Sequence, residues 1–221
     1  MRAFVFNVTI GDIKYRTRKS HRQYRQVARA ESSAATAQRI VEAFAECALT
    51  QWLEDVTLAQ VAALAGVTVR SVIRRFGGKE GLIAAFIEHL GPRIRVEFTG
   101  QPGNIEDAVE RLVTIYERYG DGTIRNLAQE SRVPALRPLL EFGRREHRQI
   151  TSIQFAPWLD HLDDEERERA LNALVIATDV YTWKLLRRDM GRSKSEVTEQ
   201  LKRLIRAVLG EYAADRQREG D

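Results

Sequence analysis

The chain has few of the residues that cross-link a protein or place it in a membrane. Among its 221 residues there is one cysteine, Cys47, so no disulfide can form within the chain. We expect this thiol to be a small buried side chain rather than a redox sensor. No run of about 18 apolar residues, the length that spans a bilayer as a helix, occurs in the sequence. We therefore expect a cytoplasmic protein that makes no contact with a membrane.

The motifs that mark many enzymes are also missing. The sequence has no Gly-x-Ser-x-Gly elbow, no glycine-rich phosphate loop and no His-Glu-x-x-His pair. His147 and His161 lack the partner spacing of a zinc site, and the acidic run 163–166 is typical of a helix N-terminus. We expect no enzyme, no metal and no cofactor.

Positive charge is concentrated in the first part of the sequence. The formal net charge is +4, but residues 1–95 carry 15 Lys and Arg against 8 Asp and Glu, whereas residues 96–221 carry 20 against 23. A basic region of this kind attracts polyanions. Residues 1–32 form a basic N-terminal extension. We expect residues 1–15 to be a solvated tail, and residues Lys14–Arg29 to be either such a tail or an arm in the minor groove of DNA.

Residues 57–76 contain two short helical patterns separated by one glycine. The first pattern has apolar residues at the i, i+3, i+4 and i+7 spacing of a buried stripe, namely Leu58, Val61, Ala62 and Ala65. Thr57 and Gln60 have the spacing of a capping box, and Thr68 is placed to cap the second helix. Gly66 lies where a sharp turn between helices needs a positive φ. The pattern predicts a helix-turn-helix.

The second helix of this unit separates into an apolar and a cationic face. Its apolar stripe consists of Val69, Val72, Ile73 and Phe76. The other side carries Arg70, Ser71, Arg74 and Arg75. Arginines bind guanine edges or phosphates, and the first turn of such a helix normally enters the major groove. The sequence therefore predicts DNA binding, with an ordinary solvated helix pair as the alternative.

The flanking segments extend this unit on both sides. Gly77–Ile83 opens a further helix with Lys79 at its N-terminus, where the ammonium and the free backbone N–H groups can reach a phosphate. Upstream, we expect a first helix over Ala37–Leu49, capped by Thr36. The candidate DNA-contacting residues are Thr57, Thr68, Val69, Arg70, Ser71, Ile73, Arg74, Arg75 and Lys79.

This arrangement resembles the DNA-binding domain of the tetracycline-repressor-like (TetR) family of bacterial regulators. The chain matches the family pattern at Thr36, Arg39, Ile40, Thr57, Ala62, Ala65, Gly66, Val67, Phe76, Lys79, Glu80 and Leu82. It departs from the pattern at Arg70, where the family usually has Gly, at Ile73, where Tyr is common, and at Arg75, where His is frequent. We expect the two arginines to strengthen phosphate or guanine contacts, and Ile73 to pack inward or touch a thymine methyl. Trp52 replaces the usual glycine after the first helix, so that turn is expected to be rebuilt.

Past Phe98, the turn-rich stretch Thr99–Asn104 leads into a second region in which all spacing is helical. The helices expected there are Ile105–Tyr119, Thr123–Glu130, Ala135–Gln154, Glu165–Arg188 and Ser195–Tyr212, with breaks near Gly120, Pro134, Pro157 and Gly191. The predicted fold class is all-α. It comprises a helix-turn-helix domain over residues 33–92 and a helical domain over residues 93–221.

The family resemblance implies that the second domain binds an effector and forms a dimer. The helix Glu165–Arg188 is apolar around most of its circumference, so it must be covered on two sides. In the family the last two long helices make a four-helix dimer interface. The interface residues expected here are Leu174, Thr178, Tyr181, Leu201, Leu204 and Val208. A monomer with a self-contained core is the alternative.

The resemblance also implies a small molecule that binds in the second domain and loosens the protein from its operator. The candidate pocket residues are Tyr116, Tyr119, Phe142, His147, Phe155 and Trp158, although aromatic residues at helical spacing are also typical of a plain core. We thus expect a homodimeric regulator of a palindromic operator on double-stranded DNA, acting as a repressor that a small hydrophobic or aromatic effector releases. The alternatives are a DNA-binding regulator without an effector and a helical enzyme.

Overall fold

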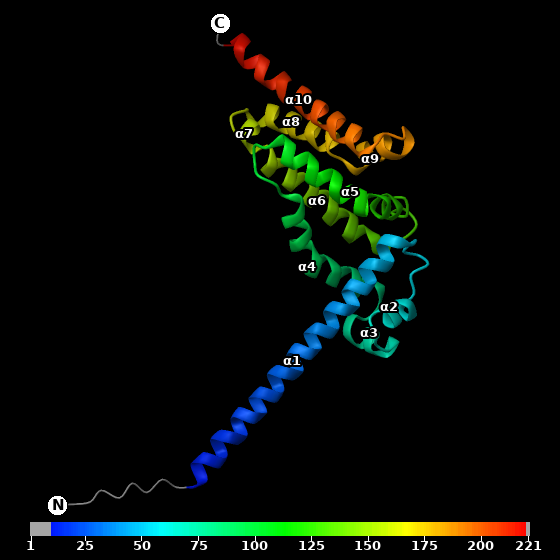
Figure 1. Ribbon diagram of the computed structural model, residues 1–221, viewed down its shortest axis with the longest axis vertical. Coiled ribbons are helices and arrows are strands. Elements are labelled where there is room, and N and C mark those ends of the chain that lie inside the picture. The colour runs from blue at the N-terminus through cyan, green and yellow to red at the C-terminus, as the bar shows by residue number, and fades with distance from the viewer. Residues whose placement is uncertain (1–9, 220–221) are drawn as a thin grey trace, which may run out of the picture.

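The computed structural model describes residues 10–219, and within that range every regular element is a helix. The first four are α1 (Ile10–Thr50), α2 (Leu58–Leu64), α3 (Val69–Phe76) and α4 (Lys79–Phe98). They are followed by α5 (Ile105–Leu127), η1 (Pro134–Leu136), α6 (Arg137–Gln154), α7 (Ala156–Leu159), α8 (Asp164–Ala177), α9 (Val180–Lys184), η2 (Leu185–Asp189) and α10 (Lys194–Glu219). Figure 1 shows α1–α4 toward one end of the molecule, α8–α10 toward the other, and α5 and α6 between them. The predicted all-α class is confirmed. None of these helices is long and apolar enough to cross a bilayer.

The molecule has two hydrophobic cores. The N-terminal core is built by α1–α4 and includes Phe44 and Leu82. Leu136 of η1 and Leu140 of α6 are buried in this same core, although they lie far along the chain. The C-terminal core is formed by α5 and α7–α10 around Trp183. Because α6 contributes to the N-terminal core, the two domains pack directly against each other.

The helix α1 begins far upstream of its predicted start. Thr36, the expected cap, lies inside the helix, where its Oγ1 donates a hydrogen bond to the Ser32 carbonyl oxygen at 2.8 Å. Hydroxyl side chains can bond backward in this way within a helix, so the presence of Thr does not by itself mark a helix start. The predicted start at Ala37 was therefore wrong. Residues 1–9 lie outside the described residues, and a DNA-contacting arm over Lys14–Arg29 stays a prediction.

The loop between α4 and α5 lies where the sequence predicts a linker. The helix α4 ends at Phe98, and Asn104 caps α5 by accepting a hydrogen bond from the Asp107 N–H at 3.0 Å. Gln154 of α6 holds this loop, because its Oε1 accepts from the Gly100 N–H at 3.0 Å and its Nε2 donates to the Gln101 carbonyl at 2.6 Å. The domain boundary expected at residues 92–93 falls within α4, so this helix belongs to both domains.

The helix α5 does not break at Gly120, contrary to the prediction. It runs unbroken from Ile105 to Leu127 and so includes the start of the separate helix expected at Thr123. A Cβ atom on Gly120 would lie 2.5–2.9 Å from ring atoms of Trp183. The absence of a side chain therefore allows an aromatic ring to pack against the helix, and it does not end the helix.

The predicted helix Glu165–Arg188 is divided into α8, α9 and η2. The division falls at Thr178 and Asp179, where Asp179 caps α9 by accepting from the Tyr181 N–H at 2.8 Å. The Thr178 carbonyl oxygen accepts from the Tyr116 hydroxyl at 3.1 Å. The prediction of one continuous helix was wrong because a partner on α5, distant in sequence, stabilises this break.

Candidate nucleic-acid interface

The turn between α2 and α3 has the predicted local geometry. Thr57 caps α2, since its Oγ1 accepts from the Gln60 N–H at 3.2 Å while the Gln60 Oε1 accepts from the Thr57 N–H at 2.8 Å. Gly66 has a φ of 65°, which glycine adopts without strain. Thr68 caps α3 by accepting from the Ser71 N–H at 3.2 Å. The capping box, the turn glycine and the second cap are confirmed.

The outer face of α3 is both cationic and apolar. Only Val72 of the predicted inner stripe is fully buried, and Phe76 is half-buried. Val69 and Ile73 are 38% and 47% exposed, so the prediction that they belong to an inner stripe was wrong, although both were also candidate DNA contacts. They share the open surface with Arg70 and Arg74, both exposed. The face therefore offers arginine hydrogen-bond donors next to apolar groups that can contact thymine methyls.

Two of the candidate cations make bonds inside the protein. The Arg75 Nη1 donates to the backbone carbonyl and the Oγ of Ser33, at 2.8 and 2.9 Å, and so ties α3 to α1. The Lys79 Nζ donates to the carbonyl oxygens of Leu53 and Glu54, at 2.8 and 3.2 Å. Both side chains hold the helix-turn-helix together, a role that the sequence did not indicate because their partners lie more than twenty residues away.

A further hydrogen bond between α1 and the helix-turn-helix was not predicted from the sequence. Arg39 of α1 directs its Nε to the Ala65 carbonyl oxygen at 3.4 Å, beside the turn at Gly66. Arg39 matches the family pattern, but nothing in its sequence neighbourhood predicts which carbonyl it would contact. We call the helix-turn-helix of residues 57–76 the reading unit, or reader, and α1–α4 the reading domain. Together, Arg39 and Arg75 fix α1 against both helices of the reading unit.

Comparison with known proteins identifies this unit. The model for bacterial regulatory proteins of the tetR family matches residues 34–86, which span the end of α1, the helix-turn-helix and the start of α4. Residues 34–86 therefore form a DNA-binding domain of the TetR type. The predictions of this family and of a DNA-binding regulator are confirmed.

Solved structures extend the likeness of fold to most of the chain. A transcriptional regulator from Rhodococcus sp. Rha1 is 16% identical and has a TM-score of 0.61, with 79% of this chain and 96% of that chain covered. A TetR transcriptional regulator from Rhodococcus sp. RHA1 is 21% identical and has a TM-score of 0.52, with 80% and 97% covered. No curated protein matches the sequence.

A small cavity lies in the C-terminal domain. Its volume is about 30 Å³. The lining consists of Phe98, Ala108, Val109, Leu112, His147, Ile150, Thr151, Gln154, Phe155, Thr178 and Ile205. Small-molecule pockets commonly measure ~300–1,000 Å³, so this cavity has to widen before it can hold a drug-sized ligand. Phe98 is the last residue of α4, and the cavity therefore reaches the helix that leads back to α3.

Of the six predicted pocket residues, His147 and Phe155 line this cavity and four do not. Tyr116 packs against Trp183, Trp158 packs against Phe155, Phe142 lies against Gly91 of α4, and Tyr119 lies beneath the Arg118 guanidinium. These four belong to packing contacts. Leu112 and Thr151 were missed because small and aliphatic side chains carry no pocket signal in a sequence, and Phe98 was missed because it stands next to the predicted linker.

The single subunit already buries half of the predicted dimer interface. Leu174 and Leu201 are 0% exposed within the C-terminal core, and Thr178 is buried beside the cavity. They cannot contact a partner, because their own subunit covers them. Tyr181 and Leu204 are exposed and Val208 is half-buried. The exposed apolar residues that the prediction missed are Ile176, Leu185 and Met190.

Proposed function

We propose that this protein is a homodimeric repressor that binds a palindromic operator and leaves it when a small, largely apolar molecule enters the C-terminal domain. The observation that carries the proposal is the open face of α3, where Arg70 and Arg74 are exposed between Val69 and Ile73. A capped, two-helix unit presenting such a face suits insertion into the major groove. A regulator of chromosomal DNA would work in the cytoplasm.

The operator is expected to be palindromic because two identical readers related by a two-fold axis meet half-sites in opposite orientation. The half-sites should lie about one helical turn apart, or ~34–36 Å. Affinity should fall steeply with salt, since every phosphate that the protein neutralises releases counterions. Lys79 as a phosphate contact stays a prediction, and its two bonds to backbone carbonyls leave one N–H of the ammonium for that role.

The experiment selects sequences from random duplex DNA with the full-length protein and measures binding to the selected operator by fluorescence anisotropy. Arg70→Ala and Arg74→Ala should each relax the preference at one base position, at about 1–3 kcal/mol for a bidentate contact. Arg118→Ala, which removes an exposed arginine of α5, is the matched control and should leave the preference intact. Equal affinity of the wild type for the operator and for random DNA would contradict the proposal.

A dimer is supported by exposed apolar side chains on the last helices. Ile176 of α8, Tyr181 of α9 and Leu204 of α10 are exposed, and α8 packs directly on α10. A symmetric contact that uses these helices from both subunits would remove such side chains from water.

Effector control is supported by the position of the cavity. Phe98 lines it from the end of α4, whose first residue lies three positions beyond the last residue of α3. A ligand that widens the cavity would displace Phe98 and with it the orientation of α4. By linkage, operator DNA must then weaken ligand binding by the same factor.

The small volume of the cavity favours a second candidate function, a regulator that binds its operator without an effector. A screen of small molecules for thermal stabilisation, followed by operator binding with each stabiliser, distinguishes the two. Ligands that bind without changing operator affinity in either direction would support the second candidate.

A further inference from the structure

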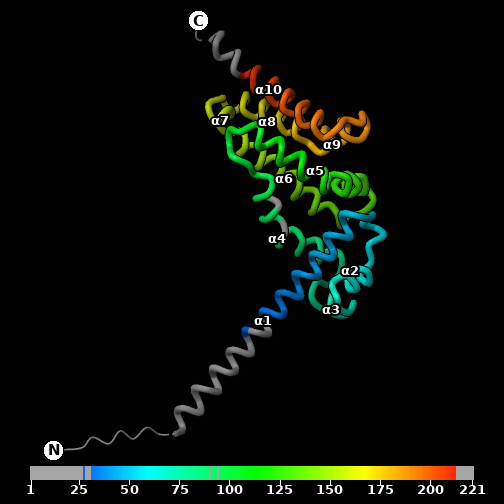
Figure 2. The backbone as a smooth tube through the Cα atoms, in the orientation of Figure 1, coloured from blue at the N-terminus to red at the C-terminus, as the bar shows by residue number. Residues whose placement is uncertain are grey.

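The carboxyl end of α1 is held by side chains of α5. The last carbonyl groups of a helix have no partner inside the helix. Here the Arg125 Nη1 donates to the Leu49 carbonyl at 2.9 Å, and the Asn126 Nδ2 donates to the Ala48 carbonyl at 3.2 Å. The guanidinium also carries the charge that the negative end of the helix dipole favours. Figure 2 shows this end of α1 meeting α5.

Gly122 allows the two helices to touch at this point. A Cβ atom on it would lie 2.6 Å from the Leu49 carbonyl oxygen and 3.0 Å from the Leu49 Cα. Both are backbone atoms, so a side chain at position 122 could be accommodated only by moving α1. The contact is therefore fixed in distance as well as in hydrogen bonding.

The contact continues into the loop before α2. Gln129, which is fully buried, accepts from the Glu54 N–H at 3.3 Å and donates to the Arg125 carbonyl at 3.0 Å. Arg132 pairs with the Glu54 carboxylate at 3.6 Å. We call this set the α1–α5 clasp; its members in the C-terminal domain are Gly122, Arg125, Asn126, Gln129 and Arg132.

One residue of the clasp, Asn126, has a buried polar atom that lowers the stability of the fold. Asn126 is buried, and its Oδ1 has no hydrogen-bond partner among the described residues, although its Nδ2 is bonded. An unsatisfied buried acceptor destabilises the fold relative to an apolar side chain of similar shape. Its presence here is explained if the position of α1, set by the Asn126 bond, matters more than stability.

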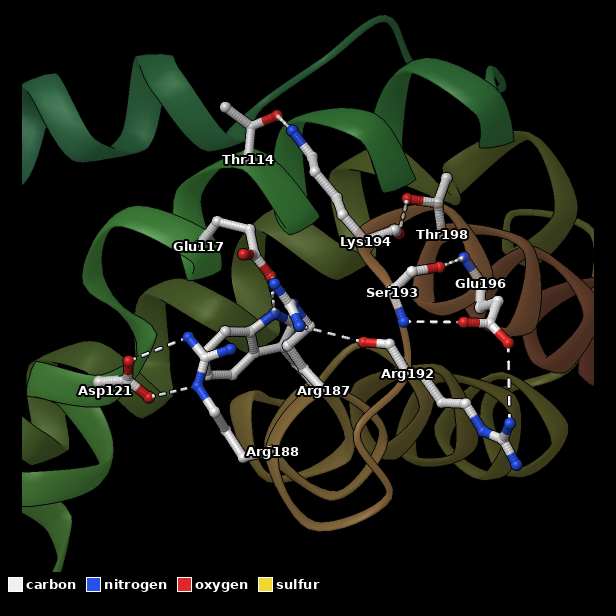
Figure 3. Close-up of polar contacts among 11 residues, drawn as sticks. Thr114, Glu117, Asp121, Arg187, Arg188, Arg192, Ser193, Lys194, Glu196 and Thr198 are labelled. Atoms are coloured by element: carbon white, nitrogen blue, oxygen red, sulfur yellow. Dashed lines mark hydrogen bonds and ion pairs between the residues drawn. The ribbon is translucent and has the colours of Figure 1, made fainter.

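The preceding turns of α5 are tied to α9 and η2. The Glu117 Oε1 accepts from the Arg187 Nε at 2.8 Å, and the Asp121 carboxylate accepts two hydrogen bonds from Arg188, both 2.9 Å long (Figure 3). Trp183 packs on Gly120, and Gly120 lies between Glu117 and Asp121 in the sequence. One helix therefore contacts the reading domain at its end and, two turns earlier, the region that carries Tyr181 and Leu185.

We propose that the α1–α5 clasp sets the distance between the two reading helices of a dimer and thereby selects the spacing of the operator half-sites. The clasp determines where α1 stands relative to α9 and η2, and α1 carries α2 and α3 through the N-terminal core. The inference rests on the proposed binding of a dimer to a palindrome.

The helices α4 and α6 and the short helix η1 also connect the domains, and α4, which joins them along the chain, is less able to set this distance alone. It contains Pro92, which removes a helical hydrogen bond and loosens the helix at that point. Its tie to α6 includes a bidentate ion pair of Arg95 with Glu146, which lies beyond Pro92 and so acts on the last turns of the helix.

The test uses the full-length protein and the operator selected by the wild type, with the distance between half-sites lengthened or shortened by one and two base pairs. Gly122→Ala displaces α1, whereas Gly143→Ala in α6 is its control, because a Cβ there meets no atom within 4 Å. Arg125→Met removes the bond to Leu49, and Arg118→Met on the same helix controls for the lost charge. Gly122→Ala is the more disruptive change. If Gly122→Ala fails to fold, Arg125→Met alone tests the proposal.

The wild type and both controls should lose about tenfold in affinity for each base pair of altered spacing. Gly122→Ala and Arg125→Met should bind the native spacing about tenfold more weakly and discriminate between spacings less than about threefold, with unchanged affinity for a single half-site. Wild-type spacing preference in both variants would overturn the proposal. An equal loss at every spacing and at the single half-site would also overturn it, because the clasp would then support the fold of the reader.

The experiment distinguishes an error in the proposed function from an error in the proposed role of the clasp. If the wild type shows no preference for paired half-sites, the palindromic dimer fails whatever the variants do. If the wild type prefers one spacing and the variants keep that preference, only the clasp fails.

Discussion

His147 is a half-buried base at the junction of the cavity and the break between α8 and α9. Its Nε2 lies 2.9 Å from the Thr178 Oγ1, and that hydroxyl donates to the Leu174 carbonyl at 2.8 Å. The hydroxyl proton is thus used, so His147 is the donor in the shared bond. Burial lowers the pKa of His147, and the Asp179 carboxylate, 3.8 Å from Nδ1, opposes that effect only in part. The imidazole is neutral at pH 7.

This environment predicts a loss of stability as the pH falls. The unfolded chain binds a proton at His147 near the ordinary pKa of ~6.5, whereas the folded protein binds it only at lower pH. Between these two values the unfolded state holds more protons, so the free energy of unfolding decreases by at most about 1.4 kcal/mol per pH unit. Thermal unfolding from pH 7.5 to 5.5 measures this. His147→Gln keeps a donor for Thr178 and should show a smaller decrease.

Carboxyl groups with a lowered pKa do not titrate in this pH range. The pKa of Asp107 and the pKa of Glu117 are lowered from already acidic values, chiefly by hydrogen bonds and against the effect of burial at Glu117, so both stay ionised above pH 5.5. Equal pH dependence in the wild type and in His147→Gln would assign the effect to another group.

At the scale of residues, the sequence predicted the caps of the reading unit but not the partners of its cations. Thr57 and Thr68 bond to atoms three residues away, so a short window contains all that is needed. Arg75 and Lys79 bond to residues 42 and 26 positions away. The packed fold determines which carbonyl a long cationic side chain reaches. The neighbouring residues in the sequence therefore do not predict this partner.

At the scale of elements, two glycines of α5 illustrate the same limit. The sequence predicts a break at Gly120 because glycine disfavours a helix interior. The packed structure instead uses Gly120 to receive Trp183 and Gly122 to receive α1. A glycine that allows a close approach and one that ends a helix look alike until the neighbouring element is known. The turn glycine Gly66 was predicted correctly because the patterns on both sides of it fix its role.

Gly120 therefore supplies a prediction about packing. In Gly120→Ala the new methyl group would overlap the Trp183 ring, and overpacking of this kind costs about 1–3 kcal/mol in stability, more than the gain in helix propensity. Chemical denaturation measures the loss. Gly210→Ala in α10, where a Cβ meets no atom within 4 Å, is the control and should be neutral or slightly stabilising. A Gly120→Ala variant as stable as its control would show that α5 and α9 can separate at little cost.

At the scale of the whole molecule, the proposed dimer depends on which apolar side chains the subunit leaves uncovered. The interface predicted from the sequence included residues that the subunit itself buries, because α8 and α10 are apolar on more than one side. Leu201 is 0% exposed, whereas Ile176 is 68% exposed. Only the packed subunit reveals which stripe faces inward.

Ile176→Asp should therefore separate the dimer without unfolding the subunit. If the α8 helices of two subunits meet, each carboxylate would be buried without a partner and close to its symmetry copy, which costs several kcal/mol. Leu201→Asp should instead unfold the subunit, because that side chain lies in the C-terminal core. Sedimentation velocity measures the mass, and circular dichroism measures the helix content.

Val96→Asp is the matched control, since Val96 of α4 is 74% exposed and is also β-branched. It should leave the protein dimeric and folded, so a general effect of added negative charge would be detected. A monomeric Ile176→Asp variant should keep the affinity of the wild-type reader for a single half-site and lose the gain in affinity that the second half-site gives, because its reading unit is unchanged. An Ile176→Asp variant that still sediments as a dimer would place the interface elsewhere than on α8.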